Sequence, residues 1–252
     1  RSTLFPYTTL FRSFYKMPEA IVITPVKDSI NTTLRTIEAI SKSKADFEYY
    51  VFNDFSTDEN TLELVKARVN FGFNLINLSD ITNTPSPNYK LVLEMAQKKA
   101  VACNCPLLII ESDVVIKNDT IEGLLAILKM KKDAGMVGAI TVDDTGNYNF
   151  PYTFEKIKRA EIVNTSHSLS FCCTLLSVNL LKQFNFETLS ENKDWFDVFI
   201  SKQSKKLGLS NYLSKQHEVL HLPHSSRPWK HLKYKNPILY YLKKLITKRD
   251  RI

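Results

Sequence analysis

The chain has 252 residues, which is long enough for one large domain or two small ones with a buried core. Hydrophobic residues make up 44% and charged residues 24%, a composition that excludes a disordered chain. Apolar runs reach only five residues, as at Leu124–Leu128, so no membrane-spanning helix is expected. Without a recognisable signal peptide, we expect an intracellular protein whose four cysteines are reduced and buried.

Glycine is scarce, with six residues in the whole chain. Their positions form neither a G-x-G-x-x-G motif nor a G-x-x-x-x-G-K motif. Both motifs use glycine to bring the backbone close to phosphate groups. The sequence therefore argues against a glycine-rich dinucleotide-binding fold and against a P-loop NTPase.

The two ends differ from the body in composition and charge. Thr3–Ser13 reads TLFPYTTLFRS and resembles a translated sequencing adapter, so residues 1–16 are expected to be an artefact without defined structure, with Met17 as the start. Residues 225–252 hold nine Lys or Arg and one Asp, which leaves residues 17–224 with a net charge of about −3. A charge confined to the tail indicates a docking surface for an anionic partner and argues against nucleic-acid binding by the body.

Short apolar runs alternate with segments of helical spacing along the first 140 residues. A capping box, Ser56–Glu59, predicts the start of the second helix, and Pro25 is expected to close the first strand. This order predicts a largely parallel sheet covered by helices. The expected strands are Ala20–Thr24, Tyr49–Phe52, Phe73–Leu78, Pro106–Ile110, Met136–Val142, Ser168–Leu176 and Val219–Leu222. The expected helices are Ser29–Ser43, Ser56 to about Val69, Tyr89–Cys103, Thr120–Lys131, Val178–Phe184 and Asp197–Leu207, the last ended by Gly208.

Acidic and amide side chains follow three of these strands. Lys27 and Asp28 follow the first strand, Asn53 and Asp54 the second, and the segment Glu111–Asp113 the fourth. Ligands of open α/β sheets bind at the carboxyl ends of the strands. Clustered oxygen ligands favour Mg²⁺ or Mn²⁺ held together with substrate phosphates. The alternative for each acid is a helix cap, as Asp54 could provide near Ser56.

The runs IVITPVKDS, VFNDFSTDEN and LLIIESDVVI together resemble family 2 glycosyltransferases of the GT-A fold. Ala134–Gly138, Ser170–Leu176, the spacing Asp197 to Gly208 and the segment from His221 to Ser226 continue the resemblance in the same order. It covers roughly residues 19–245. It implies a GT-A-type α/β domain at 17–226, with a nucleotide-binding part at about 17–142, an acceptor-side part at about 143–226 and a basic C-terminal helix at 227–252.

The resemblance also implies roles for individual residues. Asp54 would contact the nucleotide base, Asp113 of the D-x-D-like motif would ligate the divalent metal, and His221 would contact the metal or the diphosphate. Glu111 and Asn53 stand where the family usually has Asp, so Glu111 would reach the metal through water or touch the ribose. The implied donor-binding residues are Pro25, Lys27, Asp28, Asn53, Asp54 and Glu111, and the implied metal ligands are Asp113 and His221.

The catalytic base is implied to be a carboxylate at the start of a helix that ends in glycine. Asp197 lies eleven residues before Gly208 and is selected by that spacing. Asp194 is the runner-up, because Trp195 and Phe196 interrupt the usual acidic pair. The alternative for both carboxylates is capping of the helix that follows.

The implied function is inverting, metal-dependent transfer of a sugar from a nucleotide-diphosphate sugar to a glycan or lipid-linked acceptor in bacterial surface polysaccharide biosynthesis. One carboxylate base and one displacement would invert the anomeric carbon. The implied cofactor is Mn²⁺ or Mg²⁺. The alternatives are a nucleotidyltransferase, which would need a glycine- and lysine-rich phosphate loop after the first strand, and a non-catalytic protein that binds nucleic acid or a membrane through its basic tail.

The tail has an amphipathic pattern of its own. Ile238, Tyr241, Leu242 and Leu245 share one helical face, and the lysines lie off it. Such a helix suits an anionic membrane surface, which predicts a cytoplasmic protein that is peripheral at the inner face of the cell membrane. The alternative is a helix packed on the domain with a solvated lysine face.

Overall fold

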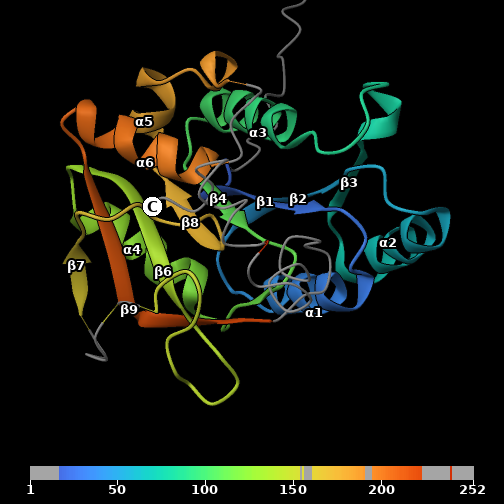
Figure 1. The fold of residues 1–252 in the computed structure, drawn as a ribbon, viewed down its shortest axis with the longest axis horizontal. Coiled ribbons are helices and arrows are strands. Elements are labelled where there is room, and N and C mark those ends of the chain that lie inside the picture. The colour runs from blue at the N-terminus through green and yellow to red at the C-terminus, as the bar shows by residue number, and fades with distance from the viewer. Residues whose placement is uncertain (1–16, 154, 156–160, 191–194, 223–238, 240–252) are drawn as a thin grey trace, which may run out of the picture.

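The computed structural model describes residues 17–153, 155, 161–190, 195–222 and 239, whose fold is shown in Figure 1. The described strands are β1 (Ala20–Val26), β2 (Phe47–Asn53), β3 (Asn74–Asn77), β4 (Leu107–Ile110), β5 (Val114–Val115), β6 (Ala134–Val142), β7 (Ile162–Asn164), β8 (Cys173–Leu176) and β9 (Ser210–His221). The α-helices are α1 (Ile30–Ser41), α2 (Asp58–Phe71), α3 (Tyr89–Cys103), α4 (Thr120–Met130), α5 (Val178–Gln183) and α6 (Phe196–Lys206), with short 3₁₀ turns at Leu78–Asp80 and Phe186–Thr188.

All nine of these strands join one sheet in the order β3-β2-β1-β4-β8-β6-β9-β5, with β7 also paired to β9. The segment β3-β2-β1-β4 is parallel, and β8 runs antiparallel to both β4 and β6. Because β9 is parallel to β6, it also runs in the direction of β4. The carboxyl ends of β1, β2, β4 and β9 therefore meet at one edge, where ligands bind in such sheets.

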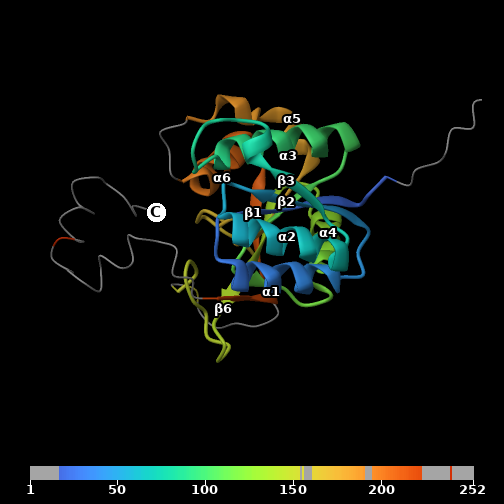
Figure 2. The ribbon, with the colours of Figure 1, turned by 90° about the vertical axis from the view of Figure 1, so that its right-hand side faces the viewer.

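Two hydrophobic cores cover the two faces of the sheet. Alternating residues of β1 enter different cores: Val22 packs on the face of α1, α2 and α4, and Ile23 on the face of α3, α5 and α6. Figure 2 shows α3, α5 and α6 on one side of the strands and α1 and α2 on the other. Both faces are thus buried, which explains why β1 and β4 read as unbroken apolar runs. The predicted α/β fold class, a central sheet flanked by helices, is confirmed.

The prediction that Pro25 closes the first strand was wrong, because β1 continues to Val26. The amide of Ile21 donates to the carbonyl of Pro106, and the carbonyl of Val26 accepts from Asp54 N, so Pro25 faces the side of β4. Pairing with β4 ends at Ile23. Pro25 has no N–H to donate, so it cannot extend this ladder.

The predicted capping box was displaced by one residue. The N-cap of α2 is Thr57, whose hydroxyl accepts from Asn60 N at 3.4 Å. Ser56 instead accepts from the backbone N–H of Asp28 at 2.9 Å. Ser56 therefore joins the β2–α2 turn to the end of β1, a contact that the local sequence pattern does not contain.

The second half of the chain holds the main departures from the predicted elements. The expected strand Ser168–Leu176 is shorter, because β8 contains only Cys173–Leu176. The expected strand Val219–Leu222 is longer, because β9 runs from Ser210 to His221. β5 and β7 were not predicted. β9 contains buried polar residues, so most of it lacks the apolar pattern of a buried strand. Asn211 is fully buried and bonds to Ser204 and to the carbonyl of Ser201 in α6. Ser214 is also fully buried and bonds to His217 within β9.

Within the described residues, no helix is long and apolar enough to cross a membrane. The predicted tail helix at 227–252 and the N-terminal segment 1–16 lie outside the described residues apart from Leu239. The same sheet contains strands from the predicted nucleotide-binding and acceptor-side parts. The division into those two parts stays a prediction.

Candidate active site

The turn after β1 is held to the turn after β2 by side-chain contacts. Asp28 accepts from Thr57 N at 2.9 Å and from the amide of Asn60 at 3.1 Å, and Lys27 donates to the carbonyl of Phe55. Burial raises the pKa of Asp28, but these hydrogen bonds and the charge of Lys27 outweigh it and lower the pKa below its usual value. Asp28 is thus an ionised carboxylate that fixes the start of α2.

Asp54 is buried at the end of β2 and holds the loop before α3. Its carboxylate accepts from Ser86 Oγ at 2.7 Å, from Asn88 N at 2.8 Å and from Asn88 Nδ2 at 2.8 Å. Asn88 also donates to the carbonyl of Thr84. A carboxylate has about four acceptor positions, so one remains after these three bonds. Asp54 therefore anchors the segment 84–88 at the binding edge of the sheet and does not cap α2.

Asn53, the neighbouring predicted site residue, is 3% exposed and bonded within the fold. Its amide nitrogen donates to Thr61 Oγ1 and to Asn77 Oδ1, both at 3.0 Å. Its amide oxygen accepts from Ser56 N at 3.2 Å. An aspartate would lack the donor that joins β2 to α2 and β3, which gives a physical reason for Asn at this position.

The structure brings His221 next to Glu111 and Asp113, which lie more than 100 residues earlier in the sequence. Glu111 follows β4, Asp113 precedes β5, and His221 ends β9 opposite Val114. The Asp113 Oδ2 and His221 Nε2 atoms are 3.2 Å apart, and both side chains are buried. His221 Nδ1 lies 2.8 Å from the carbonyl oxygen of Phe150, which fixes the orientation of the ring.

The electrostatics of this group favour positive charge. Burial lowers the pKa of His221, but the hydrogen bond and charge of Asp113, together with the charge of Glu111, more than offset it and raise the pKa above its usual value. Two carboxylates next to one imidazole attract a cation, whether a proton or a metal ion.

The donor set fits a divalent metal ion. Two ligands of one octahedral ion with bonds of about 2.1 Å are separated by about 3.0 Å, close to the 3.2 Å between Asp113 Oδ2 and His221 Nε2. Ligand atoms of Glu111, Cys172 and His221 also lie within 4.8 Å of one another. Asp113, His221 and Glu111 are therefore candidate ligands for an ion at this edge.

Cys172 is a member of this cluster that sequence reasoning treated only as a buried thiol. Its Sγ lies 3.5 Å from Glu111 Oε2, and its carbonyl accepts from Glu111 N at 3.0 Å. The pairing of β4 with β8 creates this contact, with Ile110 opposite Cys173. No spacing in the sequence carries the signal, because the two residues are 61 positions apart.

The candidate base Asp197 lies in the first turn of α6, where its Oδ1 accepts from Val198 N at 2.8 Å. Burial raises the pKa of Tyr152 well above its usual value, and the charge of Asp197 adds to this effect, so Asp197 is within electrostatic reach of Tyr152. The Tyr152 hydroxyl accepts a hydrogen bond from Ser170 N at 2.9 Å, and Ser170 lies two residues before Cys172. Asp194, the other candidate, lies outside the described residues.

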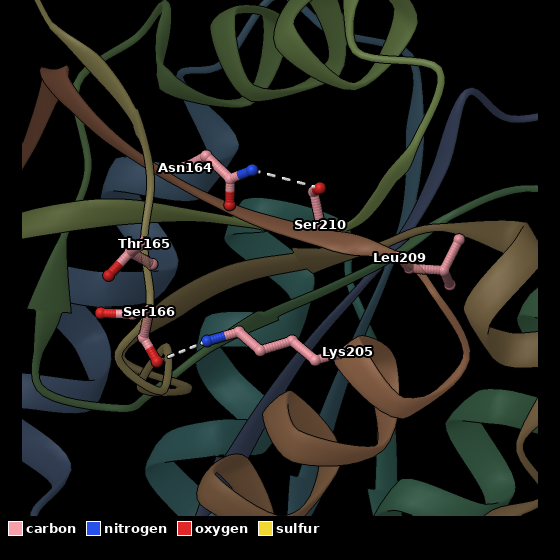
Figure 3. Close-up of a pocket in the computed structure, with 6 residues that line it drawn as sticks. All are labelled: Asn164, Thr165, Ser166, Lys205, Leu209 and Ser210. Atoms are coloured by element: carbon pink, nitrogen blue, oxygen red, sulfur yellow. Dashed lines mark hydrogen bonds between the residues drawn. The ribbon is translucent and has the colours of Figure 1, made fainter.

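A separate cavity of about 430 Å³ lies near the amino end of β9, shown in Figure 3. In that view Lys205 points toward Ser166, and the Lys205 ammonium group donates a hydrogen bond to the Ser166 carbonyl at 2.5 Å. The lining residues are Asn164, Thr165, Ser166, Lys205, Leu209 and Ser210, and they include none of the predicted site residues. Because β9 begins here and ends at His221, the cavity lies away from the predicted binding edge.

Comparison of the sequence with known families identifies the chain. The pattern of Glycosyl transferase family 2 matches residues 21–184, which include the turns after β1, β2 and β4. The chain belongs to this family. Family membership confirms the predicted resemblance to family 2 glycosyltransferases, and sugar transfer by this chain stays a prediction. No curated protein matches the family 2 chain closely enough in sequence to count as a relative.

Solved structures share this fold at low sequence identity. The family 2 chain is similar to the mannosyltransferase PcManGT from Pyrobaculum calidifontis, in complex with GDP-Man and Mn²⁺, with a TM-score of 0.63, 11% identity and 92% of this chain covered. It is similar to S. aureus TarS 1-349, with a TM-score of 0.59, 18% identity and 90% covered. A third, GalNAc-T7 with UDP, GalNAc and Mn²⁺, gives a TM-score of 0.61, 10% identity and 84% covered. The chain spans 65% of the first two structures and 45% of the third, and at these identities they establish the fold.

Proposed function

We propose that this family 2 chain transfers a sugar from a nucleotide-diphosphate sugar to a glycan or lipid-linked acceptor, with inversion at the anomeric carbon, in the synthesis of a bacterial surface polysaccharide. The observation that carries the proposal is the contact between the buried residues Asp113 and His221, with the half-buried Glu111 near His221, at the carboxyl edge of the sheet. The nucleotide and Mn²⁺ named for PcManGT and for GalNAc-T7 support the same chemistry here.

The turns after β1 and β2 form the proposed binding region for the nucleotide. Asp54 offers its fourth acceptor position to an N–H of the base, and the segment 84–88 that it anchors borders the base. Asp28 and Lys27 fix the turn after β1, and Asn53 joins the end of β2 to α2 and β3. Pro25 lies opposite Phe52 where β1 pairs with β2. These contacts hold the two turns in place before a ligand binds, which lowers the ordering cost of binding.

Asp113 and His221, with Glu111, would hold a divalent cation at the other part of the edge. When bound, Mn²⁺ or Mg²⁺ would supply the positive charge that stabilises the leaving diphosphate. The protein's own part is to orient the ligands: the carbonyl of Phe150 fixes the ring of His221, and Leu222 N donates to the carbonyl of Asp113 at 2.7 Å.

The acceptor hydroxyl needs a base, because it is a poor nucleophile at neutral pH. Asp197 is our proposed base, with Asp194 as the alternative. As the bond to the anomeric carbon forms, the carboxylate takes the hydroxyl proton, and the bond to the diphosphate oxygen breaks. A single displacement of this kind inverts the anomeric configuration.

The basic tail supports a place at the inner face of the cell membrane. Residues 225–252 carry a net charge of +8, and each basic residue near an anionic surface contributes about 1 kcal/mol to binding. We propose that this segment docks the enzyme on anionic lipid beside a lipid-linked acceptor. The support is the sequence pattern of apolar and basic residues, because the segment lies outside the described structure apart from Leu239.

The test is release of free nucleoside diphosphate from a panel of UDP-, GDP- and dTDP-sugars, with Mn²⁺ or Mg²⁺ and with a chelator as the control. We expect one nucleotide class to give metal-dependent release that increases when an acceptor is added. If a nucleoside triphosphate and a sugar 1-phosphate are supplied in a separate reaction, release of pyrophosphate would indicate a nucleotidyltransferase. Binding of sugar nucleotides with no release under any condition would contradict the proposed transfer.

A further inference from the structure

Cys172 places a buried sulfur atom inside the proposed metal site. The residue is 2% exposed and directly precedes β8. Its Sγ lies 3.5 Å from Glu111 Oε2, and Ser170 Oγ lies 3.3 Å away on another side. The backbone bond between Glu111 N and the carbonyl of Cys172 holds the two residues together at 3.0 Å. The sulfur is thus fixed beside a metal-ligand candidate by main chain and side chain alike.

The observed separations match those of ligands on one ion. A thiolate bound at about 2.3 Å and a carboxylate at about 2.0 Å, at a tetrahedral angle, are about 3.5 Å apart. The observed distance from Cys172 Sγ to Glu111 Oε2 is 3.5 Å. With His221, the three ligand atoms lie within 4.8 Å of one another, so small side-chain rotations bring all three onto one ion.

The neighbouring cysteine shows that this placement is specific to Cys172. The ligand atoms that lie within 4.8 Å of one another belong to Glu111, Cys172 and His221, and Cys173 is not in this group. Cys173 is fully buried in β8, opposite Ile110. Cys173 is accordingly a matched control.

We propose that Cys172 is a ligand of the same divalent metal site, as a thiolate together with Glu111 and His221. The inference rests on the proposed function for the position of the ion. On binding, the S–H bond breaks, the proton passes to solvent, and a bond from sulfur to metal forms. Sulfur ligands favour softer ions, so the site accepts Zn²⁺, Co²⁺ and Cd²⁺ with sulfur coordination and disfavours Mg²⁺, which requires oxygen ligands.

The test is titration of the full chain with Co²⁺ and with Cd²⁺, followed by thiolate-to-metal charge-transfer absorption in the near ultraviolet. We expect the band in the wild type and in Cys173→Ser, and its loss in Cys172→Ser. Calorimetry should show that Cys172→Ser weakens Cd²⁺ binding by about tenfold or more, and weakens Mn²⁺ binding much less.

A variant that leaves Cys172 intact covers the case in which Cys172→Ser does not fold. The combined change of Cys103, Cys105 and Cys173 to Ser leaves Cys172 as the only thiol of the four and should keep the band. Loss of the band there, its survival in Cys172→Ser, or Cd²⁺ binding to the wild type without any band would each overturn the inference. A Cys172-dependent band in a protein that releases no nucleoside diphosphate would instead contradict the proposed function and leave the thiolate ligand standing.

Discussion

Replacement of Asp113 by Asn tests the metal site with the smallest change in shape. The carboxylate is 2% exposed and its Oδ2 lies 3.2 Å from His221 Nε2. Asn keeps the size and one acceptor oxygen but loses the negative charge. Removing one preorganised group that stabilises a developing charge costs about 3–4 kcal/mol, or about 10²–10³-fold in kcat. We therefore expect turnover to fall by that factor.

The same substitution should leave the fold almost unchanged. Losing a charged hydrogen bond costs about 1–2 kcal/mol, but Asn also removes the cost of burying a charge, which offsets part of this. The free energy of unfolding should change by about 1 kcal/mol, or a few degrees in Tm for a domain of this size. A larger loss in the free energy of unfolding would mean that Asp113 is needed mainly for the stability of the fold.

The assay combines initial rates of nucleoside diphosphate release with calorimetric titration of Mn²⁺ in the presence of nucleotide. Asp133→Asn is the matched control, because Asp133 accepts from the hydroxyl of Tyr212 at the opposite end of the sheet, before β6. The control should keep both the rate and the Mn²⁺ affinity. If Asp113→Asn also keeps both, the assignment of Asp113 as a metal ligand is refuted.

Asp197→Asn should lower turnover by about 10²–10⁴-fold with little change in donor affinity, because a base acts on the acceptor; the same phenotype in Asp194→Asn alone would show that spacing selected the wrong carboxylate. Thr57→Ala should cost about 0.5–1 kcal/mol in the free energy of unfolding, because the cap bond is long at 3.4 Å. Ser56→Ala instead removes the contact to the turn after β1, so it should weaken nucleotide binding measured by calorimetry. Chemical unfolding compares the two variants: an equal loss in the free energy of unfolding for Thr57→Ala and Ser56→Ala would contradict Thr57 as the N-cap. Deletion of residues 243–252 removes five basic residues and should reduce binding to anionic liposomes by about 1 kcal/mol per residue, less at high salt, with metal binding intact. Unfolding of the truncated chain would contradict the membrane interpretation and favour a packed helix.

The sequence by itself determined the parallel part of the sheet and the identity of its binding edge. β1 and β4 are buried on both faces, so nearly all of their residues are apolar, and such runs are visible locally. Thr24 is the polar exception in β1, and it accepts a hydrogen bond from the Tyr49 hydroxyl. Because parallel strands share a direction, the residues that follow them, such as Asp54 and Asp113, had to meet at one edge. The family and the fold followed from those motifs.

Only the tertiary structure decided how β9 and the group of candidate metal ligands form. β9 buries Asn211, which bonds to Ser204 Oγ at 2.7 Å, and Lys215, which pairs with Glu155 at 2.8 Å. Polar residues can be buried when such partners exist, and partners distant in sequence leave no local pattern. The approach of Cys172 to Glu111 has the same origin, since it depends on the register of β8 against β4. The spacing of apolar residues along the sequence indicates which residues a strand buries. Polar contacts between residues on different strands are fixed only when the strands pair.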